Sequence, residues 1–179
     1  MNHYYLVSSL PYLKPGIEPP VRSRDFLAQC AAQLPASEVA ALTAVSLIPR
    51  ATAASPVEAR WNQHETYLRN TLIRVRASQR HHHEVAGYLR PEGAAFGGIE
   101  NAVRDAYNRD PFQLEEQIDR LRWRFLDDLT IGHEFDFTAV FVYHVKLLLL
   151  EKRIGLDVTA GQRCLDEIVA ARLHAVKIF

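Results

Sequence analysis

Three kinds of segment carry residue types that could perform chemistry: a run of histidines, a glycine-rich stretch and clusters of carboxylates. His81, His82 and His83 are consecutive. Consecutive side chains on a helix point about 100° apart, so these three rings cannot converge on one metal ion without ligands from elsewhere. The spacings of a helical metal site, His-Glu-x-x-His or Glu-x-x-His, are absent from the sequence. We interpret the run as solvated histidines at a helix end.

The glycine-rich stretch Gly93–Gly98 could surround a phosphate, because glycine lets backbone N–H groups approach an anion closely. It lacks the Gly-Lys-Ser/Thr ending of a phosphate-binding loop, and no predicted strand precedes it. We therefore interpret this stretch as a connector between helices.

Carboxylates occur in the C-terminal half as adjacent or nearby residues. They are Glu115 with Glu116, Asp127 with Asp128, and Glu134 with Asp136. General acid–base catalysis needs carboxylates that face each other across a cleft, and neighbours on one helix do not. The sequence also has no nucleophile-elbow motif. We predict no catalytic residue, no cofactor-binding residue, no metal ligand and no enzymatic activity.

The composition is that of an ordinary soluble globular protein. The chain has 179 residues, of which 48% are hydrophobic and 23% are charged. Lys+Arg and Asp+Glu both number 21, a balance that argues against a nucleic-acid coat protein. Two cysteines are too few for a disulfide framework or a thiolate metal site. No apolar run approaches the roughly 20 residues that span a bilayer, and the first residues lack a signal-peptide core, so we expect a cytoplasmic protein.

Helical periodicity and the positions of proline and glycine predict an all-α fold. We expect one elongated helical bundle of about seven helices over residues 1–179, with no convincing strand pairs. Its parts are an irregular proline-rich segment over 1–20, a helical pair over 21–49, a long spine helix over 56–88 and a C-terminal helical bundle over 99–175. The strongest start signals are Ser55-Pro56-Val57-Glu58, a capping box, and Asp110-Pro111-Phe112-Gln113.

Charge is divided unevenly along the chain. Residues 60–90 hold six arginines and two glutamates, a net charge of +4, whereas residues 100–136 hold ten acids and five arginines, a net charge of −5. Either the basic helix packs against the acidic segment, or both charged surfaces face outward and bind partners. The candidate partner interface comprises Arg69, Arg74, Arg76, Arg80, Asp127, Asp128 and Glu134.

RNA phosphates are a further candidate partner for the basic segment. Binding of single-stranded nucleic acid usually adds exposed aromatic side chains on which bases stack. Trp61 and Tyr67 are the aromatic residues in the basic segment, and Trp61 lies on the apolar stripe of the predicted helix. Nucleic acid is therefore the less favoured partner.

Polar residues beside the apolar stripe of the spine helix indicate a structural network. Glu65 and Arg69 have the favourable i, i+4 spacing of a helical ion pair. Asparagine has a low helix propensity, so Asn62 and Asn70 are expected to bond to neighbouring segments. The candidate network comprises Trp61, Asn62, Glu65, Arg69, Asn70 and Trp123.

Longer sequence blocks cover most of the chain. They are Tyr4-Tyr5-Leu6-Val7-Ser8-Ser9-Leu10-Pro11-Tyr12-Leu13, Phe26-Leu27-x-x-Cys30, Trp61-Asn62-x-x-Glu65-x-x-Leu68-Arg69-Asn70, Asp110-Pro111-Phe112, Leu121-Arg122-Trp123-x-Phe125-Leu126-Asp127-Asp128-Leu129, Gly132-His133-x-Phe135-Asp136 and Val142-Tyr143-x-x-Lys146-Leu147-x-Leu149-Leu150-Glu151-Lys152. Together these blocks resemble a bacterial family of unknown function that accompanies V/A-type ATPase subunits. That family looks like a shortened relative of the C-type central-stalk component of these ATPases, which is called d in the vacuolar enzyme.

The resemblance implies an all-helical, non-catalytic component of the central stalk that links the rotor axle to the membrane ring. Its partners would be rotor or ring subunits of a V/A-type ATPase, with no small-molecule substrate. Contact with the inner membrane would be peripheral and only through these partners. A stand-alone cytoplasmic helical module for protein interactions is the alternative, and an RNA-binding helical protein is a third hypothesis.

Overall fold

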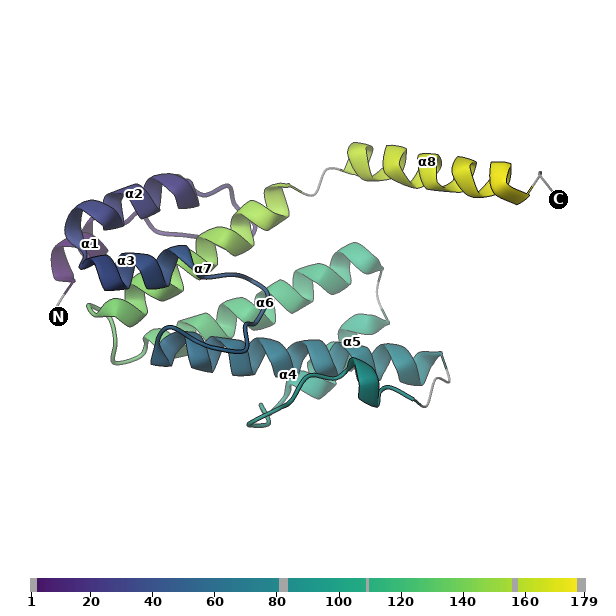
Figure 1. The fold of residues 1–179 in the computed structure, drawn as a ribbon, viewed down its shortest axis with the longest axis horizontal. Helices are drawn as coiled ribbons and strands as arrows, with labels where there is room; N and C mark the ends of the chain where they lie inside the picture. Colours follow the sequence, from purple (N-terminus) through teal and green to yellow (C-terminus); the bar gives the residue numbers. More distant parts are fainter. Residues whose placement is uncertain (1–2, 81–83, 109, 156–157, 177–179) are drawn as a thin grey trace.

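The computed structural model describes residues 3–80, 84–108, 110–155 and 158–176, and for residues 158, 160 and 170–176 it describes the backbone alone. All regular secondary structure in these ranges is helical, which confirms the predicted all-α class (Figure 1). The α-helices are α1 (Tyr4–Ser9), α2 (Ser23–Gln33), α3 (Ala36–Thr43), α4 (Pro56–Gln79), α5 (Ile99–Tyr107), α6 (Pro111–Thr130), α7 (Phe137–Ile154) and α8 (Val158–Val176), and a 3-10 turn, η1, covers Ala86–Tyr88.

Three long helices, α4, α6 and α7, form the centre of the molecule. The short helices α2 and α3 pack on α7, while α5 packs against α4 and α6. Figure 1 shows α7 between the N-terminal helices and α6, with α8 extending away from the other helices. Helix α7 has buried residues on all sides, as its apolar sequence predicts.

The apolar core consists of two adjoining clusters. The larger one gathers around Phe26, Trp61 and Phe141, whose side chains are fully buried. The second lies between α4, α5 and α6 and includes Leu68 and Val103. Helix α4 contributes to both clusters, so it acts as the spine that the sequence predicted, although it is shorter than expected. No helix in the described ranges is both long enough and apolar enough to cross a bilayer.

The predicted extent of the spine helix, 56–88, is wrong, because α4 ends at Gln79. Val75 is the last buried residue of the helix, and without an apolar face to bury, further turns gain little from packing. The run His81–His83 lies outside the described residues. After it, the chain returns along α4 through η1, and the backbone of Arg90 bonds to Asn70.

Two differences concern the N-terminal third. The segment 1–20, predicted to be irregular, contains helix α1, which is held in place because Leu6 is buried and His3 N donates to Phe135 O at 2.7 Å. The pair α2 and α3 forms within 21–49, but α3 ends at Thr43. The backbone after Thr43 is not helical, and the carbonyl groups of Ser46 and Leu47 accept hydrogen bonds from side chains of α4.

The predicted C-terminal bundle over 99–175 is also corrected. Helices α5, α6 and α7 pack together, whereas the described side chains of α8 at 159 and 161–169 are all exposed. The physical reason lies in α7, whose surface is already covered by α2, α3, α4 and α6. Most of the α7 surface is therefore already in contact with other helices.

Candidate functional site

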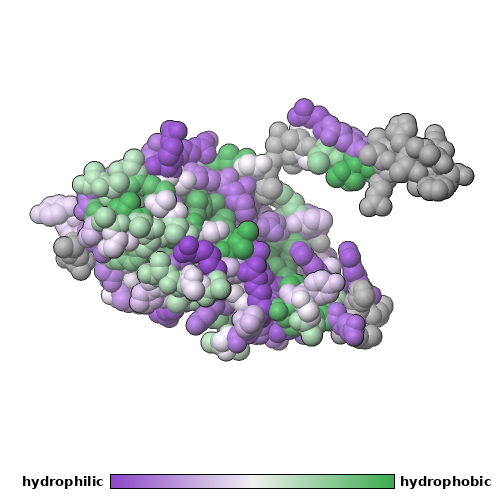
Figure 2. Space-filling model, in the orientation of Figure 1, coloured by the Kyte–Doolittle hydropathy of each residue, from purple (hydrophilic) through white to green (hydrophobic). Residues whose placement is uncertain are grey.

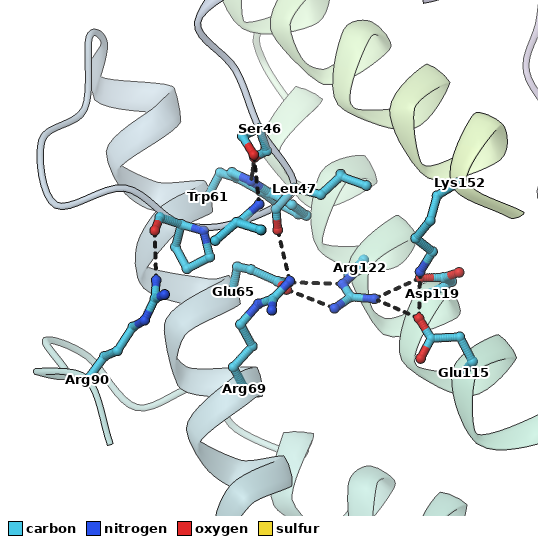
Figure 3. A network of polar contacts seen from close by, with 12 residues as sticks. Ser46, Leu47, Trp61, Glu65, Arg69, Arg90, Glu115, Asp119, Arg122 and Lys152 are labelled. Atoms are coloured by element: carbon cyan, nitrogen blue, oxygen red, sulfur yellow. Dashed lines mark hydrogen bonds and ion pairs between the residues drawn. The ribbon is translucent and has the colours of Figure 1, made fainter. Parts of the chain in front are cut away.

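A buried ion pair joins α4 to α6 at the centre of the molecule (Figure 3). Arg122 Nε donates to Glu65 Oε2 at 2.9 Å and Arg122 Nη2 donates to Glu65 Oε1 at 2.8 Å. The Glu65 side chain is fully buried and that of Arg122 is 8% exposed. This two-bond geometry is the one in which arginine binds a carboxylate most specifically.

The pair extends to α7 through two more carboxylates. Arg122 Nη1 donates to Asp119 Oδ1 at 2.8 Å, and Lys152 Nζ donates to Asp119 at 2.7 Å and to Glu115 at 2.6 Å. Burial opposes the charge of Arg122, but the hydrogen bonds and charges of Glu65 and Asp119 outweigh it and raise the pKa of Arg122. The result is an alternating chain of charges that connects the three long helices.

On its other side, the network holds the loop that precedes α4. Arg69 Nε donates to Glu65 Oε1 at 2.7 Å, and Arg69 Nη2 donates to Leu47 O at 3.1 Å. Trp61 Nε1 reaches Ser46 O at 3.4 Å. The two carbonyl groups belong to the loop after α3, where no helix supplies them with donors. Side chains of α4 provide the hydrogen bonds that buried polar groups require.

The segment that returns along α4 is fixed by one asparagine. Asn70 Oδ1 accepts from Arg90 N at 3.1 Å, while Asn70 Nδ2 donates to Arg90 O at 2.8 Å and to Glu92 at 2.7 Å. Arg74 Nη2 donates to the second oxygen of Glu92 at 3.0 Å. Asn70 therefore pairs with the return segment as another strand of backbone would.

The candidate structural network is brought together in part. Four of its residues, Trp61, Glu65, Arg69 and Asn70, make the contacts described above. The Nδ2 of Asn62 has no hydrogen-bond partner among the described residues. Trp123 lies apart from the network, where Lys146 Nζ sits 5.0 Å from its ring centre.

The decisive residue that sequence reasoning did not assign to the network is Arg122. A signal was present, because Arg122 lies four residues from Ile118 and from Leu126, on the buried stripe of α6. Glu58 and Glu65 interrupt the buried face of α4 in the same way. A charged residue on an apolar stripe predicts a buried ion pair, and the sequence offers such residues on both helices.

The candidate partner interface is not one surface. Arg69 turns inward to Glu65, and Arg74 pairs with Glu92, whereas Arg76 and Arg80 are exposed at the end of α4. The acidic residues of the candidate interface lie at the C-terminal end of α6 and in the segment that follows it. Asp127 pairs with Lys146 at 2.5 Å, Asp128 is exposed, and Glu134 accepts from Gly132 N at 3.1 Å.

The basic and acidic segments do contact each other, but the described ion pair between them does not use the residues that give each segment its net charge. Among the described residues, the ion pair that links α4 and α6 runs from an acid of the basic segment, Glu65, to an arginine of the acidic segment, Arg122. Four acids of α6 pair with basic residues of α6 and α7, namely Glu115, Glu116, Asp119 and Asp127. Net charge per segment therefore did not identify the charges that bind each other.

Two buried histidines lie beside the network. The ring of His64 stacks on Phe125 with 3.9 Å between ring centres, and burial, with a contribution from the charge of Arg122, lowers the pKa of His64 to about 4. Burial likewise lowers the pKa of His144 to about 4. Both rings are therefore neutral at pH 7. No group of three His, Cys, Asp or Glu residues in the described ranges is placed to hold a metal ion.

Comparison with known proteins connects the C-terminal half of the chain to one family. No curated protein and no solved structure matched the sequence. Residues 96–175, which include α5 to α8 with Arg122 and Lys152, match the family model described as "Protein of unknown function (DUF2764)". Over this region the chain is therefore similar to a family whose function is not known, in agreement with the unknown-function family that the sequence blocks resemble.

Proposed function

We propose that this protein is a non-catalytic helical adaptor that binds another protein through α8. The observation that carries the proposal is the exposed apolar face of this helix. Leu165 is 53% exposed, Ile168 56% and Val169 48%. Their spacing places all three on one side of the helix.

An apolar face exposed to water is unfavourable in free energy unless another surface covers it. Isolated helices of this length are only marginally stable in water, and most helical stability in proteins comes from packing an apolar face. Figure 2 shows hydrophobic residues on one side of the described part of α8 and hydrophilic residues on the opposite side. An amphipathic helix that is free of its own protein is suited to lie in the groove of a partner.

The rest of the molecule forms a well-connected helical base. The chain of charges from Glu65 to Lys152 joins the three long helices, and α7, which directly precedes α8, is buried along most of its length. A rigid base with one projecting helix can transmit position or force between partners. This architecture supports an adaptor more directly than it supports an enzyme.

We further propose, from the resemblance of its sequence blocks, that the partner is a rotor or ring subunit of a bacterial V/A-type ATPase. In this role the protein would link the rotor axle to the membrane ring from the cytoplasmic side. It would contact the inner membrane only through its partners. A helical architecture without a metal cluster in the described ranges is compatible with this role.

The test is affinity purification of the tagged full chain from detergent-solubilised membranes of its own host, followed by mass spectrometry. We expect ATPase rotor or ring subunits to co-purify with the wild type. Ile168→Lys, which places a charge on the apolar face, should abolish this association. Glu167→Lys makes a similar change on the opposite side of α8 and should leave it intact.

The outcomes separate the two leading functions. Partners that depend on Ile168 but include no ATPase subunit would support the stand-alone helical interaction module instead. Association that survives Ile168→Lys as well as Glu167→Lys would contradict α8 as the binding element.

A further inference from the structure

A cleft of about 530 Å³ lies beside α4, on the side away from the Glu65–Arg122 pair, and the adaptor function makes no use of it. Its volume is within the range of about 300–1,000 Å³ that is usual for small-molecule sites. A second cleft, beside Tyr12, has a volume of about 250 Å³. The larger cleft is bounded by α4, by the loop before it and by the segment that returns along it.

The floor of the cleft is one face of α4 that lacks large apolar side chains. It consists of Ala59, Asn62, Gln63 and Thr66, at positions i, i+3, i+4 and i+7 of the helix. The short side chains of Ala59, Asn62 and Thr66 leave space between the two walls. The polar groups of Asn62, Gln63 and Thr66 can both donate and accept hydrogen bonds.

The walls are held in place by hydrogen bonds, so the cleft is preformed. Arg90 Nη1, from one wall, donates to Pro49 O of the other at 2.8 Å. The loop wall is fixed further where Ala54 N donates to Glu58 Oε2 at 2.6 Å. Preformed walls reduce the ordering cost of binding a ligand.

Charge in the cleft is of one sign. Among the described residues, Arg50 and Arg90 line it, and no aspartate or glutamate does. Arg50 is oriented by Glu58, which accepts from its Nε at 3.0 Å and also from its Nη2. Arg90 has no carboxylate partner within the described residues, and its Nη1 alone is occupied, by Pro49 O. Glu58 therefore balances the charge of Arg50 and holds it in place, whereas Arg90 keeps, within the described ranges, an uncompensated charge, which favours an anion with several oxygens.

An unsatisfied group at the floor adds a second observation. Asn62 is 8% exposed, and its Nδ2 has no hydrogen-bond partner among the described residues. A buried polar group without a partner costs free energy, and in native proteins each such group calls for an explanation. Asn62 also lines the cleft, so a rotation of its buried amide group would bring this unused donor to a bound ligand.

We propose that this cleft binds a small organic oxyanion, either a carboxylate or a phosphate ester. The anionic group lies between Arg50 and Arg90, and the polar body of the ligand bonds to the side chains of Asn62, Gln63 and Thr66. The cleft is larger than a bare phosphate or acetate ion needs, so the ligand carries a body of several atoms beyond the anion. The site is independent of α8, and either proposal can fail without the other.

The experiment is a titration of the full chain with succinate and, separately, with glycerol 3-phosphate, followed by two-dimensional NMR of side-chain amides. Sodium chloride at matched ionic strength is the reference. We expect saturable shifts of the Asn62 and Gln63 amide signals with at least one of the two probes. The probe that binds more tightly assigns the site to carboxylates or to phosphate esters.

Three variants make the test specific. Arg90→Gln should weaken the binding about tenfold or more, because it removes the guanidinium of the cleft that has no carboxylate partner among the described residues. Arg76→Gln removes an exposed arginine of α4 outside the cleft and should change binding by less than about twofold. Thr66→Leu keeps every charge but fills the floor, so it tests the cleft even if Arg90→Gln disturbs the loop.

Two results would overturn the proposal. One is the absence of saturable shifts beyond those that chloride produces, for both probes. The other is equal weakening by Arg90→Gln and Arg76→Gln, together with unchanged binding in Thr66→Leu, which would show general attraction of anions to surface arginines.

Discussion

The two ends of α4 use the same residue types in opposite ways. In the first half of the helix, Glu58 and Glu65 are buried and each binds arginine. At the other end, Arg76 and Arg80 are exposed to solvent. The difference follows from what lies beside each charge, because Arg50 of the loop before α4 and Arg122 of α6 reach the two buried glutamates, whereas Arg76 and Arg80 lie beyond Arg74, which the return segment contacts through Glu92.

This comparison shows that charge on α4 has two roles. Where other elements surround the helix, a charge must be paired, and it then fixes which elements meet. Where the helix is open, charge contributes little to folding and is available for steering partners. The following predictions test this division, and each is measured on the full-length chain.

The largest effect is expected from breaking the buried pair. Arg122→Met should lower the free energy of unfolding by about 3 kcal/mol, because Glu65 stays buried with Arg69 as its remaining partner. Urea denaturation followed by circular dichroism measures this change. Adding Glu65→Met to the same chain should recover most of the loss. If the double variant loses the sum of the two single effects, the pair does not act as a unit.

The buried apolar face in the middle of α4 should respond about as strongly. Leu68 is fully buried, and Leu68→Ala should cost about 2–5 kcal/mol through lost burial and the cavity left behind. Arg76→Ala, on the exposed end, should change stability by no more than about 0.5 kcal/mol. Equal losses for these two variants, again in urea denaturation, would contradict the division of α4 into a packed and an open end.

The third prediction concerns pH. The pKa of His64 is about 4 in the folded protein, below the usual value of 6.5, so the unfolded state takes up the proton first as the pH falls. The stability that depends on a neutral His64 is therefore complete above pH 6.5 and is lost between pH 6.5 and 4. The loss should amount to about 1–3 kcal/mol at pH 4.

The replacement His64→Phe tests this assignment. It removes the titrating group and keeps an aromatic ring next to Phe125, so it should flatten the curve of stability against pH. A slope will remain, because His144 has the same shift. An unchanged curve in thermal melts from pH 4 to 7 would show that His64 is not responsible.

The smallest effect on stability is expected at the exposed end. Replacing Arg74, Arg76 and Arg80 together by glutamine should cost about 0–1 kcal/mol, since Glu92 provides the one carboxylate partner described there. The same variant should bind ATPase-containing membranes more weakly in a sedimentation assay, if these arginines orient a partner. A cooperative loss of the helical signal would show that this end also holds the fold together.

The starts of the three long helices could be predicted from sequence because each depends on residues a few positions apart. Ser55 accepts from Glu58 N at 3.2 Å, Asp110 accepts from Phe112 N at 2.9 Å, and Asp136 accepts from Thr138 N at 2.7 Å. Such caps stabilise a helix N-terminus without help from the rest of the molecule. The apolar periodicity was equally local, and it identified α4, α6 and α7 as the helices with faces to bury.

The helix ends and the charge partners were decided by tertiary structure. Glu58 was expected to complete a capping box, but its carboxylate binds Arg50 and Ala54 N instead. Arg69 was assigned to Glu65 by spacing, whereas Arg122, 57 positions from Glu65 in the chain, is set opposite it only when α4 and α6 pack.

The sequence by itself determined an all-helical protein, the starts of its main helices and an i, i+4 pair on the spine, because these depend on local spacing. Only the tertiary structure decided that α4 stops at Gln79, that α8 stands apart from the bundle and that a cleft with two arginines opens beside α4. These features arise from contacts between segments distant in the chain. Their energies depend on which surfaces are already covered, and local sequence patterns do not contain that information.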